Sequence, residues 1–338
     1  MTVAPPVRAL LAIGRDANQF FPADRLGLLR SLVDLRLPEG RLCQERYSEQ
    51  LAASRPEIVI TGWGSPCLTA ALWAAHPQVR YVCHVAGTVR SVVERRVVEA
   101  GLLVTNWGDS ISRTVAEAAL LGILSCLRRT THVDLLMHRD SGWFGRDQRG
   151  SLRSLFHRRV GLHGFGQVAQ ALVRLLAPFQ CAVAAFDPFV PASVFEACGV
   201  RQMATLEELY ATSEVVSIHC PGGAATYHSV GAPLLGLMKD GSCLINTARG
   251  SVIDTEALAR ELATGRVSAA LDVFEDEPLP EASPLRGLPN CQLTCHTAGP
   301  TVDRVVDAGD AALANIARYV EGGRLVGVVD ADQYERHS

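Results

Sequence analysis

The feature that most constrains the fold is a glycine-rich turn between an apolar run and a helical one. Residues 160–163 predict a strand, and helical periodicity extends over 168–176. Between them the chain reads Gly164-Phe165-Gly166-Gln167-Val168-Ala169. The order strand, G-x-G-x-x-A, helix is an accepted form of the dinucleotide-binding fingerprint, in which the first glycine makes the turn and the second admits a diphosphate. The sequence therefore predicts that residues 164–168 and the start of the helix hold a dinucleotide.

An acidic residue stands where such a site needs one. The next apolar run, 182–186, ends at Asp187, roughly 20 residues after Gly164. A carboxylate there accepts hydrogen bonds from ribose hydroxyls and repels a 2′-phosphate, and no Arg occurs in the following DPFVPAS. The pattern favours NAD over NADP. The alternative is an ordinary strand–helix turn in which Asp187 caps a helix.

Strands and helices alternate along the whole chain. With 48% hydrophobic and 20% charged residues, it can bury a large core. Apolar runs predict strands that include 9–13, 57–61, 80–85, 102–105, 160–163, 182–186, 215–219, 243–246 and 269–273. Helical periodicity lies between most of them. Continuous apolar strands alternating with helices indicate parallel sheets covered on both faces.

Several segments suggest a division into domains. Residues 112–138 predict one long helix, SGWFGRDQRGS predicts a loop, DEPLPEASPLRGLPN is a Pro-rich interruption, and residues 301–320 predict a final amphipathic helix. We expect an α/β protein of two domains with parallel sheets. The NAD-binding domain spans 112–299, with a linking helix at its start, and is inserted into a substrate domain made of 1–111 and 300–338.

Charge and composition exclude several classes of function. The net charge of −3 provides no overall field for nucleic acid or an anionic membrane, and no run is long and apolar enough to span a bilayer. Ten cysteines scattered through apolar runs favour free thiols, which together with the absence of an export signal predicts a cytoplasmic protein. Cys291-x-x-x-Cys295-His296 lacks a second ligand pair at zinc-like spacing, so we expect no metal.

Polar residues cluster where four predicted strands end. These are His219-Cys220-Pro221, then Asn246, Thr247, Arg249 and Gly250, then Asp272, Glu275 and Glu277, and finally His296. Each alone has an ordinary interpretation as a surface, capping or loop residue. Together they place a cation, a carboxylate and an imidazole at the edge where open α/β sheets bind ligands. Such a set suits hydride transfer, because an imidazole can donate the proton and an Arg can bind a substrate carboxylate.

Several motifs carry a resemblance to a known family. GLHGFGQVAQAL, VSIHCP, LINTARGSVIDTEAL, ALDVFEDEPLP and the HTAG segment are similar to the D-isomer-specific 2-hydroxyacid dehydrogenase family, almost continuously over about 158–299. Upstream, LLVTNWGDSISRTVAEAALLGIL is similar to the family's domain-linking helix. The resemblance implies two Rossmann-like or flavodoxin-like domains with a cleft between them, usually in a homodimer. It also implies reversible reduction of a 2-oxo acid to a D-2-hydroxy acid with NAD(H).

The resemblance assigns roles to individual residues. Arg249 corresponds to the substrate-binding arginine, His296 to the acid/base, and Glu277 to the carboxylate that pairs with the histidine, with Glu275 as the competing candidate. Substrate contacts are implied at Ala86, Gly87, Thr88, Arg249 and His296. Cofactor contacts are implied at Gly164, Phe165, Gly166, Gln167, Val168, Asp187, His219, Cys220, Pro221, Thr226, Thr247, Ala248, Arg249, Asp272, His296 and Gly299.

The chain also departs from the family's pattern. Ala169 replaces the third glycine, Cys295 replaces the usual Pro before the histidine, and PGGAATYHS replaces the common Pro-Leu-Thr stretch. The Cys295 replacement predicts a less rigid His296 loop. Two alternatives stay open: a phosphonate, phosphite or formate-type substrate on the same scaffold, and an NAD-sensing binding protein without turnover. Arg90, Arg95, Arg96 and Arg113 could accept an extra anion or form a solvated helix face.

Overall fold

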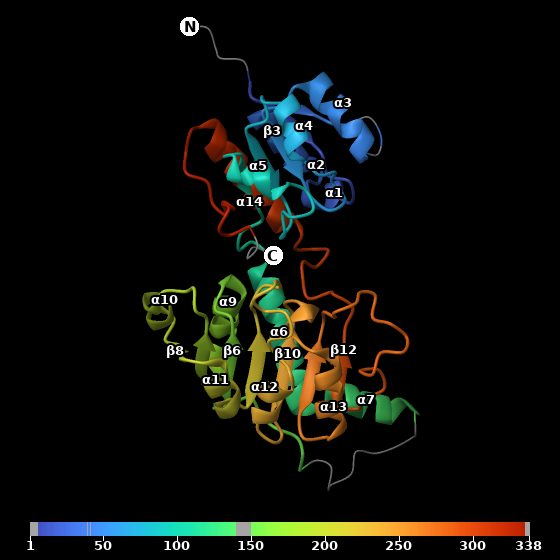
Figure 1. Cartoon of the computed structure of the whole chain (residues 1–338), viewed down its shortest axis with the longest axis vertical. Coiled ribbons are helices and arrows are strands. Elements are labelled where there is room, and N and C mark those ends of the chain that lie inside the picture. Colours follow the sequence, from blue (N-terminus) through green and yellow to red (C-terminus); the bar gives the residue numbers. More distant parts are fainter. Residues whose placement is uncertain (1–5, 39, 41, 140–149, 335–338) are drawn as a thin grey trace. The chain divides into compact units, whose positions relative to one another are not determined.

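The chain folds into two compact units (Figure 1). The structure, a computed structural model, describes residues 6–38, 40, 42–139 and 150–334. One unit contains residues 1–111 and 301–338, and the other contains residues 112–300. The predicted loop SGWFGRDQRGS falls almost entirely outside the described residues.

The first unit is built on a parallel sheet with strand order β2-β1-β3-β4-β5, the flavodoxin-like order. Its strands are β1 (Arg8–Leu11), β2 (Asp34–Arg36), β3 (Ile58–Thr61), β4 (Tyr81–His84) and β5 (Leu103–Thr105). Its helices are α1 (Ala17–Phe20), α2 (Ala23–Leu32), α3 (Gln44–Ser54), α4 (Ala70–Ala75), α5 (Arg95–Glu99) and α14 (Val306–Val320). Apolar residues of α1, α2 and α14 form a core with the sheet, and those of α3 and α5 contribute to a second core.

The second unit is built on a parallel sheet with strand order β12-β11-β10-β9-β6-β7-β8. Its strands are β6 (Arg159–His163), β7 (Ala182–Phe186), β8 (Arg201–Gln202), β9 (Val215–Ile218), β10 (Cys243–Asn246), β11 (Ser268–Leu271) and β12 (Cys291–Leu293). Its helices are α6 (Ser112–Arg128), α7 (Thr130–Arg139), α9 (Gln167–Leu176), α10 (Ala192–Ala197), α11 (Leu206–Thr212), α12 (Ala232–Leu237) and α13 (Thr255–Ala263), with short 3₁₀ turns at Ala177–Phe179 and Gly250–Val252.

Helices cover both faces of this second sheet. Residues of α6 and α9 form one hydrophobic core, and those of α11, α12 and α13 form another. Strand order reverses between β6 and β9, so the crevice beyond their carboxyl ends is the place where such sheets bind dinucleotides. The predicted α/β class with two parallel-stranded sheets is confirmed.

Three local predictions need correction. The single helix over 112–138 was wrong: α6 ends at Arg128, Arg129 has a left-handed φ of 51°, and α7 begins at Thr130. The apolar period of the sequence continues through the break at Arg129, so the period does not reveal the break. Strands β2 and β8 were missed because they are short, polar edge strands. The final helix begins at Val306 rather than 301.

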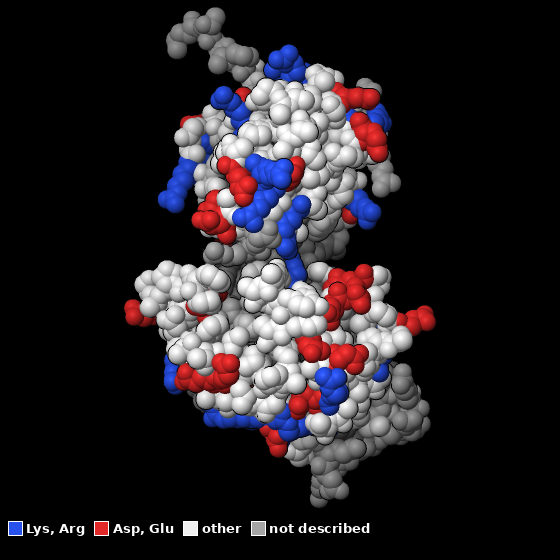
Figure 2. Space-filling view, in the orientation of Figure 1, with Lys and Arg blue, Asp and Glu red and all other residues white. Residues whose placement is uncertain are grey.

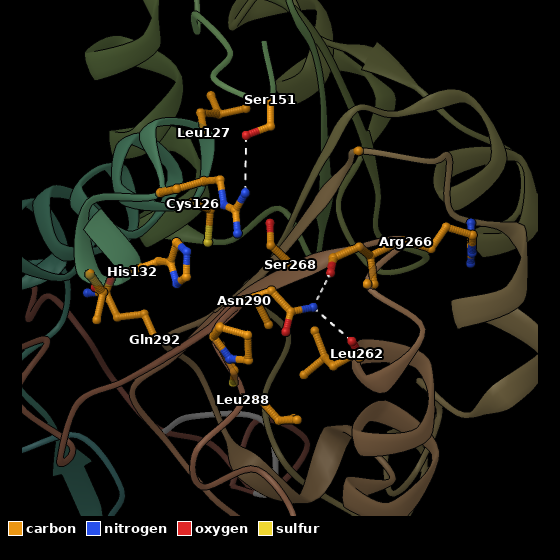
Figure 3. A pocket seen from close by; sticks show the side chains of 18 of the residues that line it. Cys126, Leu127, His132, Ser151, Leu262, Arg266, Ser268, Leu288, Asn290 and Gln292 are labelled. Atoms are coloured by element: carbon orange, nitrogen blue, oxygen red, sulfur yellow. Dashed lines mark hydrogen bonds between the residues drawn. The ribbon is translucent and has the colours of Figure 1, made fainter. Parts of the chain in front are cut away.

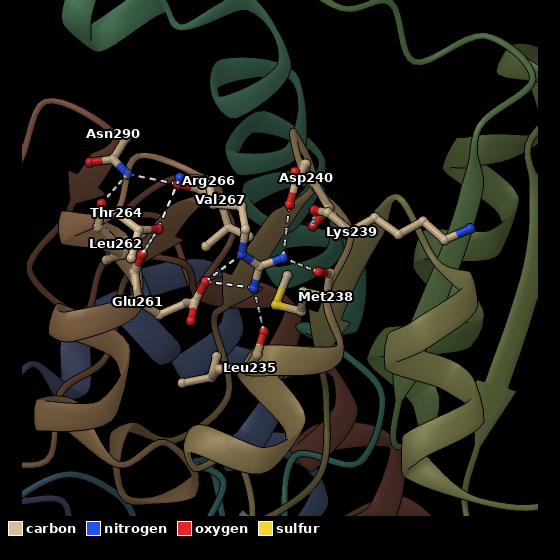
Figure 4. Close-up of polar contacts among 11 residues, drawn as sticks. Leu235, Met238, Lys239, Asp240, Glu261, Leu262, Thr264, Arg266, Val267 and Asn290 are labelled. Atoms are coloured by element: carbon tan, nitrogen blue, oxygen red, sulfur yellow. Dashed lines mark hydrogen bonds and ion pairs between the residues drawn. The ribbon is translucent and has the colours of Figure 1, made fainter.

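An arginine network fixes the amino-terminal edge of the second sheet (Figure 4). Arg266 donates to Glu261 Oε1 at 2.5 Å, to the Leu235 carbonyl at 3.0 Å, to Asp240 Oδ1 at 3.2 Å and to the Met238 carbonyl. Its side chain is only 26% exposed. These bonds connect the end of α12 to α13 and to the start of β11. The connection helps to fix the positions of the strands that the candidate site residues follow.

Charges of both signs are interspersed on the face shown in Figure 2. In the described part of the chain, no helix combines the length and apolarity that crossing a membrane requires.

Candidate functional site

The glycine turn follows β6 and meets the loop that follows β9. Gly164 has a φ of 95°, and a Cβ atom there would lie 2.6 Å from the Cys220 nitrogen and 2.7 Å from the His219 carbonyl carbon. Both the backbone conformation and the close approach therefore require glycine. The predicted turn thus lies at the point where the strand order reverses.

Gly166 borders open space at the start of α9. Apart from its two chain neighbours, no described residue has a heavy atom within 4 Å of the position its Cβ would take, and Gly166 is the N-cap of α9 without a side-chain cap. The first N–H groups of a helix lack intrahelical partners and attract anions. The residues present therefore fit the diphosphate of a dinucleotide.

Asp187 lies directly after β7 and is anchored to the glycine turn. Its Oδ2 accepts from the Phe165 N–H at 2.9 Å, and its Oδ1 accepts from the Phe189 N–H at 2.9 Å. The N-cap of α10 is Pro191, so Asp187 does not cap that helix. Each carboxylate oxygen retains capacity for a further hydrogen bond, which suits a ribose hydroxyl.

A cavity of about 500 Å³ has Phe186, the residue directly before Asp187, in its wall. The sequence did not predict this cavity. Phe186, Thr205, Leu206, His228 and Ser229 contribute to its wall. The buried Ser229 hydroxyl has no hydrogen-bond partner among the described residues. His228 and Ser229 lie in PGGAATYHS, which the sequence marked only as a departure from the family's pattern, and the other wall residues belong to no motif.

The segment after β9 contains a half-buried, uncharged histidine. Burial lowers the pKa of His219 to about 3, and the Nε2 atom of His219 has no hydrogen-bond partner among the described residues. Burial also raises the pKa of the Cys220 thiol to about 12, which makes it a poor nucleophile. The Thr226 hydroxyl donates to the Pro221 carbonyl at 2.7 Å and so closes the turn.

The turn after β10 positions Arg249. The Asn246 side chain donates to the Arg249 carbonyl at 2.9 Å and accepts from the Ala248 N–H at 3.0 Å. A Cβ atom on Gly250 would lie 1.8 Å from the Phe274 carbonyl carbon, so the turn packs directly against the loop after β11. The Thr247 hydroxyl is buried without a hydrogen-bond partner in the part of the chain the structure describes.

Asp272, directly after β11, organises the segment that contains His296. Its Oδ1 accepts from the Thr294 hydroxyl at 2.6 Å and the Thr297 N–H at 2.9 Å, and its Oδ2 accepts from the Ala298 N–H at 2.8 Å. The His296 N–H donates to the Asp272 carbonyl at 2.7 Å. These contacts hold His296 in a left-handed conformation with a φ of 55°. Sequence reasoning missed the threonines.

The histidine pairs with one of the two candidate carboxylates. His296 Nδ1 lies 2.7 Å from Glu277 Oε2, while Glu277 Oε1 accepts from the Phe274 N–H at 3.0 Å. Glu275, the competing candidate, instead lies 2.6 Å from His228 Nε2. Because Nδ1 of His296 faces Glu277, its Nε2 is the nitrogen left to exchange a proton with a ligand.

The predicted substrate loop lies in the first unit, after β4. Asn106 Nδ2 donates to the Gly87 carbonyl at 3.0 Å, and the Trp107 N–H donates to the Ala86 carbonyl at 3.3 Å. Among the described residues, the N–H groups of Gly87 and Thr88 donate to no acceptor. Of the candidate cations, Arg95 forms an ion pair with Glu99 on α5, in keeping with a solvated helix face.

A second cavity, of about 310 Å³, lies at the amino-terminal ends of strands in the second sheet, whereas the candidate site lies at the carboxyl ends (Figure 3). Cys126, His132, Ser268 and Gln292 contribute to its wall, and Asn290 donates there to the Leu262 and Val267 carbonyls. This wall includes the starts of β11 and β12, whereas the predicted site residues of this unit follow the strand ends. The cavity is therefore separate from the candidate site.

The fold and the site together define a class of protein. An NAD-binding oxidoreductase of this fold combines a glycine turn where the strand order reverses with an acidic residue after the next strand. This chain has both, and it has an Arg after β10 and a His–Glu pair in the loops after β11 and β12. Residues 120–298, more than half of the chain, match the family model described as "D-isomer specific 2-hydroxyacid dehydrogenase, NAD binding domain". The chain therefore belongs to the D-isomer specific 2-hydroxyacid dehydrogenase family, as its motifs predict.

Individual relatives agree with this assignment. The chain is 30% identical to a D-3-phosphoglycerate dehydrogenase of Methanocaldococcus jannaschii over 69% of its own length, but the match spans only 44% of that protein. It is 28% identical to a glyoxylate reductase of Thermofilum pendens, over 90% of this chain and 91% of that protein. The structure of D-mandelate dehydrogenase from Rhodotorula graminis matches with a TM-score of 0.84 at 22% identity, covering 96% and 97% of the two chains. The last likeness establishes the fold.

Proposed function

We propose that this protein catalyses the reversible, NAD-dependent reduction of a 2-oxo acid to a D-2-hydroxy acid. The observation that carries the proposal is the 2.7 Å contact between His296 Nδ1, after β12, and Glu277 Oε2, after β11. Strand β11 lies beside β10, the strand that Arg249 follows. The names of the two protein relatives, a glyoxylate reductase and a phosphoglycerate dehydrogenase, fit acids of this class.

The residues of the second unit divide the work of cofactor binding. The glycine turn and the start of α9 bind the diphosphate, and Asp187 accepts the ribose hydroxyls. The cavity that Phe186 and Ser229 help to line suits the adenine, because it is concave and partly apolar. Residues of the loops after β9, β10 and β11 border the nicotinamide, including Thr226, Thr247 and Asp272. Bound NADH supplies the hydride.

The remaining residues act on the substrate. Arg249 binds the carboxylate and polarises the neighbouring carbonyl through its planar guanidinium. His296 donates a proton from Nε2 to the carbonyl oxygen during reduction and takes it back during oxidation. Glu277 orients the ring and stabilises its protonated form. Ala86, Gly87 and Thr88 contribute backbone N–H groups for an anionic substrate, which fits the two N–H groups without acceptors.

A panel assay tests this function. The purified protein is mixed with NADH and each of glyoxylate, hydroxypyruvate, a branched 2-oxo acid and a phosphonate analogue, and nicotinamide absorbance is followed. We expect turnover of at least one acid, loss of turnover in His296→Ala, and nearly unchanged NADH affinity measured by nicotinamide fluorescence. Tight NADH binding without turnover of any acid would overturn the proposal in favour of formate- or phosphite-type substrates first, and an NAD sensor second.

Two further parts of the proposal concern the protein's state. We propose a homodimer, which sedimentation analysis at several concentrations tests, and a cytoplasmic location, which fractionation tests. The interspersed charges on the face in Figure 2 fit a small-molecule substrate rather than nucleic acid.

A further inference from the structure

A second histidine–carboxylate contact lies on the same sheet edge as the proposed catalytic pair. Glu275 stands two residues before Glu277, and its Oε1 lies 2.6 Å from His228 Nε2 and accepts from the Tyr227 hydroxyl at 3.2 Å. Its Oε2 accepts from the Thr255 hydroxyl at 3.0 Å. A single carboxylate therefore contacts the loop after β9 and the start of α13, while itself belonging to the loop after β11.

These three segments contain proposed site residues. Thr226 directly precedes Tyr227, Arg249 lies in the turn that leads to α13, and Glu277 follows Glu275. Along the chain, each of these site residues is within six positions of Glu275 or of a residue that the Glu275 carboxylate contacts. A shift of any one segment would therefore displace a residue that binds the cofactor, the substrate or His296.

Backbone hydrogen bonds extend the contact between two of the segments. The His228 N–H donates to the Ser251 carbonyl at 2.9 Å, and the Val230 N–H donates to the Val252 carbonyl at 3.0 Å. In return, the Asp254 N–H donates to the Val230 carbonyl at 3.1 Å. The Glu275 contacts lie beside this backbone ladder and connect it to the loop that contains Glu277.

The Glu275 carboxylate is held in its charged form. Burial disfavours the charge, but hydrogen bonds from His228 and Thr255 outweigh that effect, and the pKa of Glu275 lies below its usual value. The side chains of Glu275 and His228 are 29% and 33% exposed, so water screens their attraction less than it screens a fully exposed pair.

We propose that Glu275 is a positioning residue for catalysis, which holds the loops carrying Thr226, Arg249 and Glu277 in register through His228, Tyr227 and Thr255. This inference rests on the proposed function and deepens it. It separates the two acidic residues of the ALDVFEDEPLP segment by role: Glu277 contacts the catalytic imidazole, and Glu275 acts through the loops. A residue of this kind limits kcat more than it limits cofactor affinity.

The test compares Glu275→Ala with the control Asp276→Ala. Asp276 is the adjacent exposed carboxylate and has no hydrogen-bond or ion-pair partner among the described residues, so its removal changes the charge in the same way. We expect Glu275→Ala to lower kcat about 10- to 100-fold, since small misplacements of reacting groups have effects of this size. The NADH dissociation constant should change less than about threefold, and Asp276→Ala should behave as wild type.

Conservative variants separate positioning from general stability. Glu275→Gln keeps one acceptor oxygen, so it should restore part of kcat, and Tyr227→Phe, which removes the longest bond, should have the smallest effect. A fall in melting temperature with kcat unchanged in Glu275→Ala would overturn the proposal, as would equal losses in Glu275→Ala and Asp276→Ala.

Hydrogen exchange provides a readout that does not depend on turnover. In Glu275→Ala, but not in Asp276→Ala, the N–H groups of His228 and Val230 should exchange faster, because the ladder loses its side-chain support. Unchanged exchange would overturn the positioning role even if the wild type reduces 2-oxo acids. Faster exchange in a protein that turns over no acid would instead remove the proposed function and leave the structural link in place.

Discussion

Replacing Glu277 by Gln tests the proposed catalytic pair most directly. The substitution keeps the shape and one acceptor oxygen but removes the charge that faces His296 Nδ1 at 2.7 Å. In the proposed oxidation of a D-2-hydroxy acid, His296 would take up a proton and positive charge would develop on its ring. In that role Glu277 would stabilise the charge in the transition state more than in the ground state, so its loss should lower kcat.

The size of the effect follows from the separation of the charges. Coulomb's law gives about 1.5 kcal/mol for unit charges 2.7 Å apart at a dielectric constant of about 80, and about 3 kcal/mol at about 40. The side chains of His296 and Glu277 are 49% and 36% exposed, so strong solvent screening applies. A loss of about 1.5 to 3 kcal/mol corresponds to a fall in kcat of about 10- to 150-fold.

The assay follows formation of NADH from NAD and the D-2-hydroxy acid that matches the best acid in the panel. Asp276→Asn serves as the control for charge removal in the same loop, and nicotinamide fluorescence measures NADH binding separately. A Glu277→Gln kcat within about twofold of wild type would refute the reasoning, because the Coulomb energy at a dielectric constant of about 80 already corresponds to a loss of about 10-fold. A similar fall in Asp276→Asn would show that the charge acts through the loop and not through His296.

Four other outcomes are expected. Arg249→Lys should recover little of the kcat/KM lost in Arg249→Ala, because a point charge cannot make a two-pronged contact with a carboxylate, and steady-state kinetics on both variants checks this. Asp187→Ala should raise the NADH dissociation constant and reduce discrimination against NADPH, as measured by fluorescence titration. Arg266→Leu should lower the free energy of unfolding by about 2 kcal/mol with KM unchanged, because partners of Arg266 lose their hydrogen bonds; denaturant titration measures this. Burial lowers the pKa of His163 to about 4 and of His219 to about 3, against 6.5 for an unburied histidine. The unfolded chain therefore binds more protons below pH 6.5, and the melting temperature should fall as pH drops from 6.5 towards 4, with a shallower fall in His163→Gln.

The local geometry of the candidate cofactor site could be predicted from sequence because its determinants are local. A left-handed turn at Gly164, open space beside Gly166 and an acidic residue after the next strand all follow from short stretches of chain. The alternation of strands and helices then places all the strand ends on one edge, since every pairing in the sheet of the second unit is parallel.

The pairing of acidic residues could not be derived from the sequence alone. Glu275 and Glu277 are separated by one residue, and both lie in an exposed loop after β11. Their different partners, His228 and His296, come from the loops after β9 and β12. The family resemblance favoured Glu277, but only the packing of the three loops shows what Glu275 contacts. The break at Arg129 escaped prediction for a related reason, because a single left-handed residue leaves the apolar pattern of both helices intact.

The segment around His296 shows how a departure from a family pattern can be offset elsewhere in the structure. With Cys295 in place of the usual proline, this segment lacks a residue that fixes its own backbone. Asp272, which follows β11, restrains this segment through hydrogen bonds. Its carbonyl accepts from the His296 N–H at 2.7 Å, and its carboxylate accepts from the N–H groups of Thr297 at 2.9 Å and Ala298 at 2.8 Å. Three consecutive N–H groups are thereby bonded to one buried residue, which is only 4% exposed. The left-handed conformation of His296 is thus held by tertiary hydrogen bonds, so proline at position 295 is not required to aim the imidazole at Glu277.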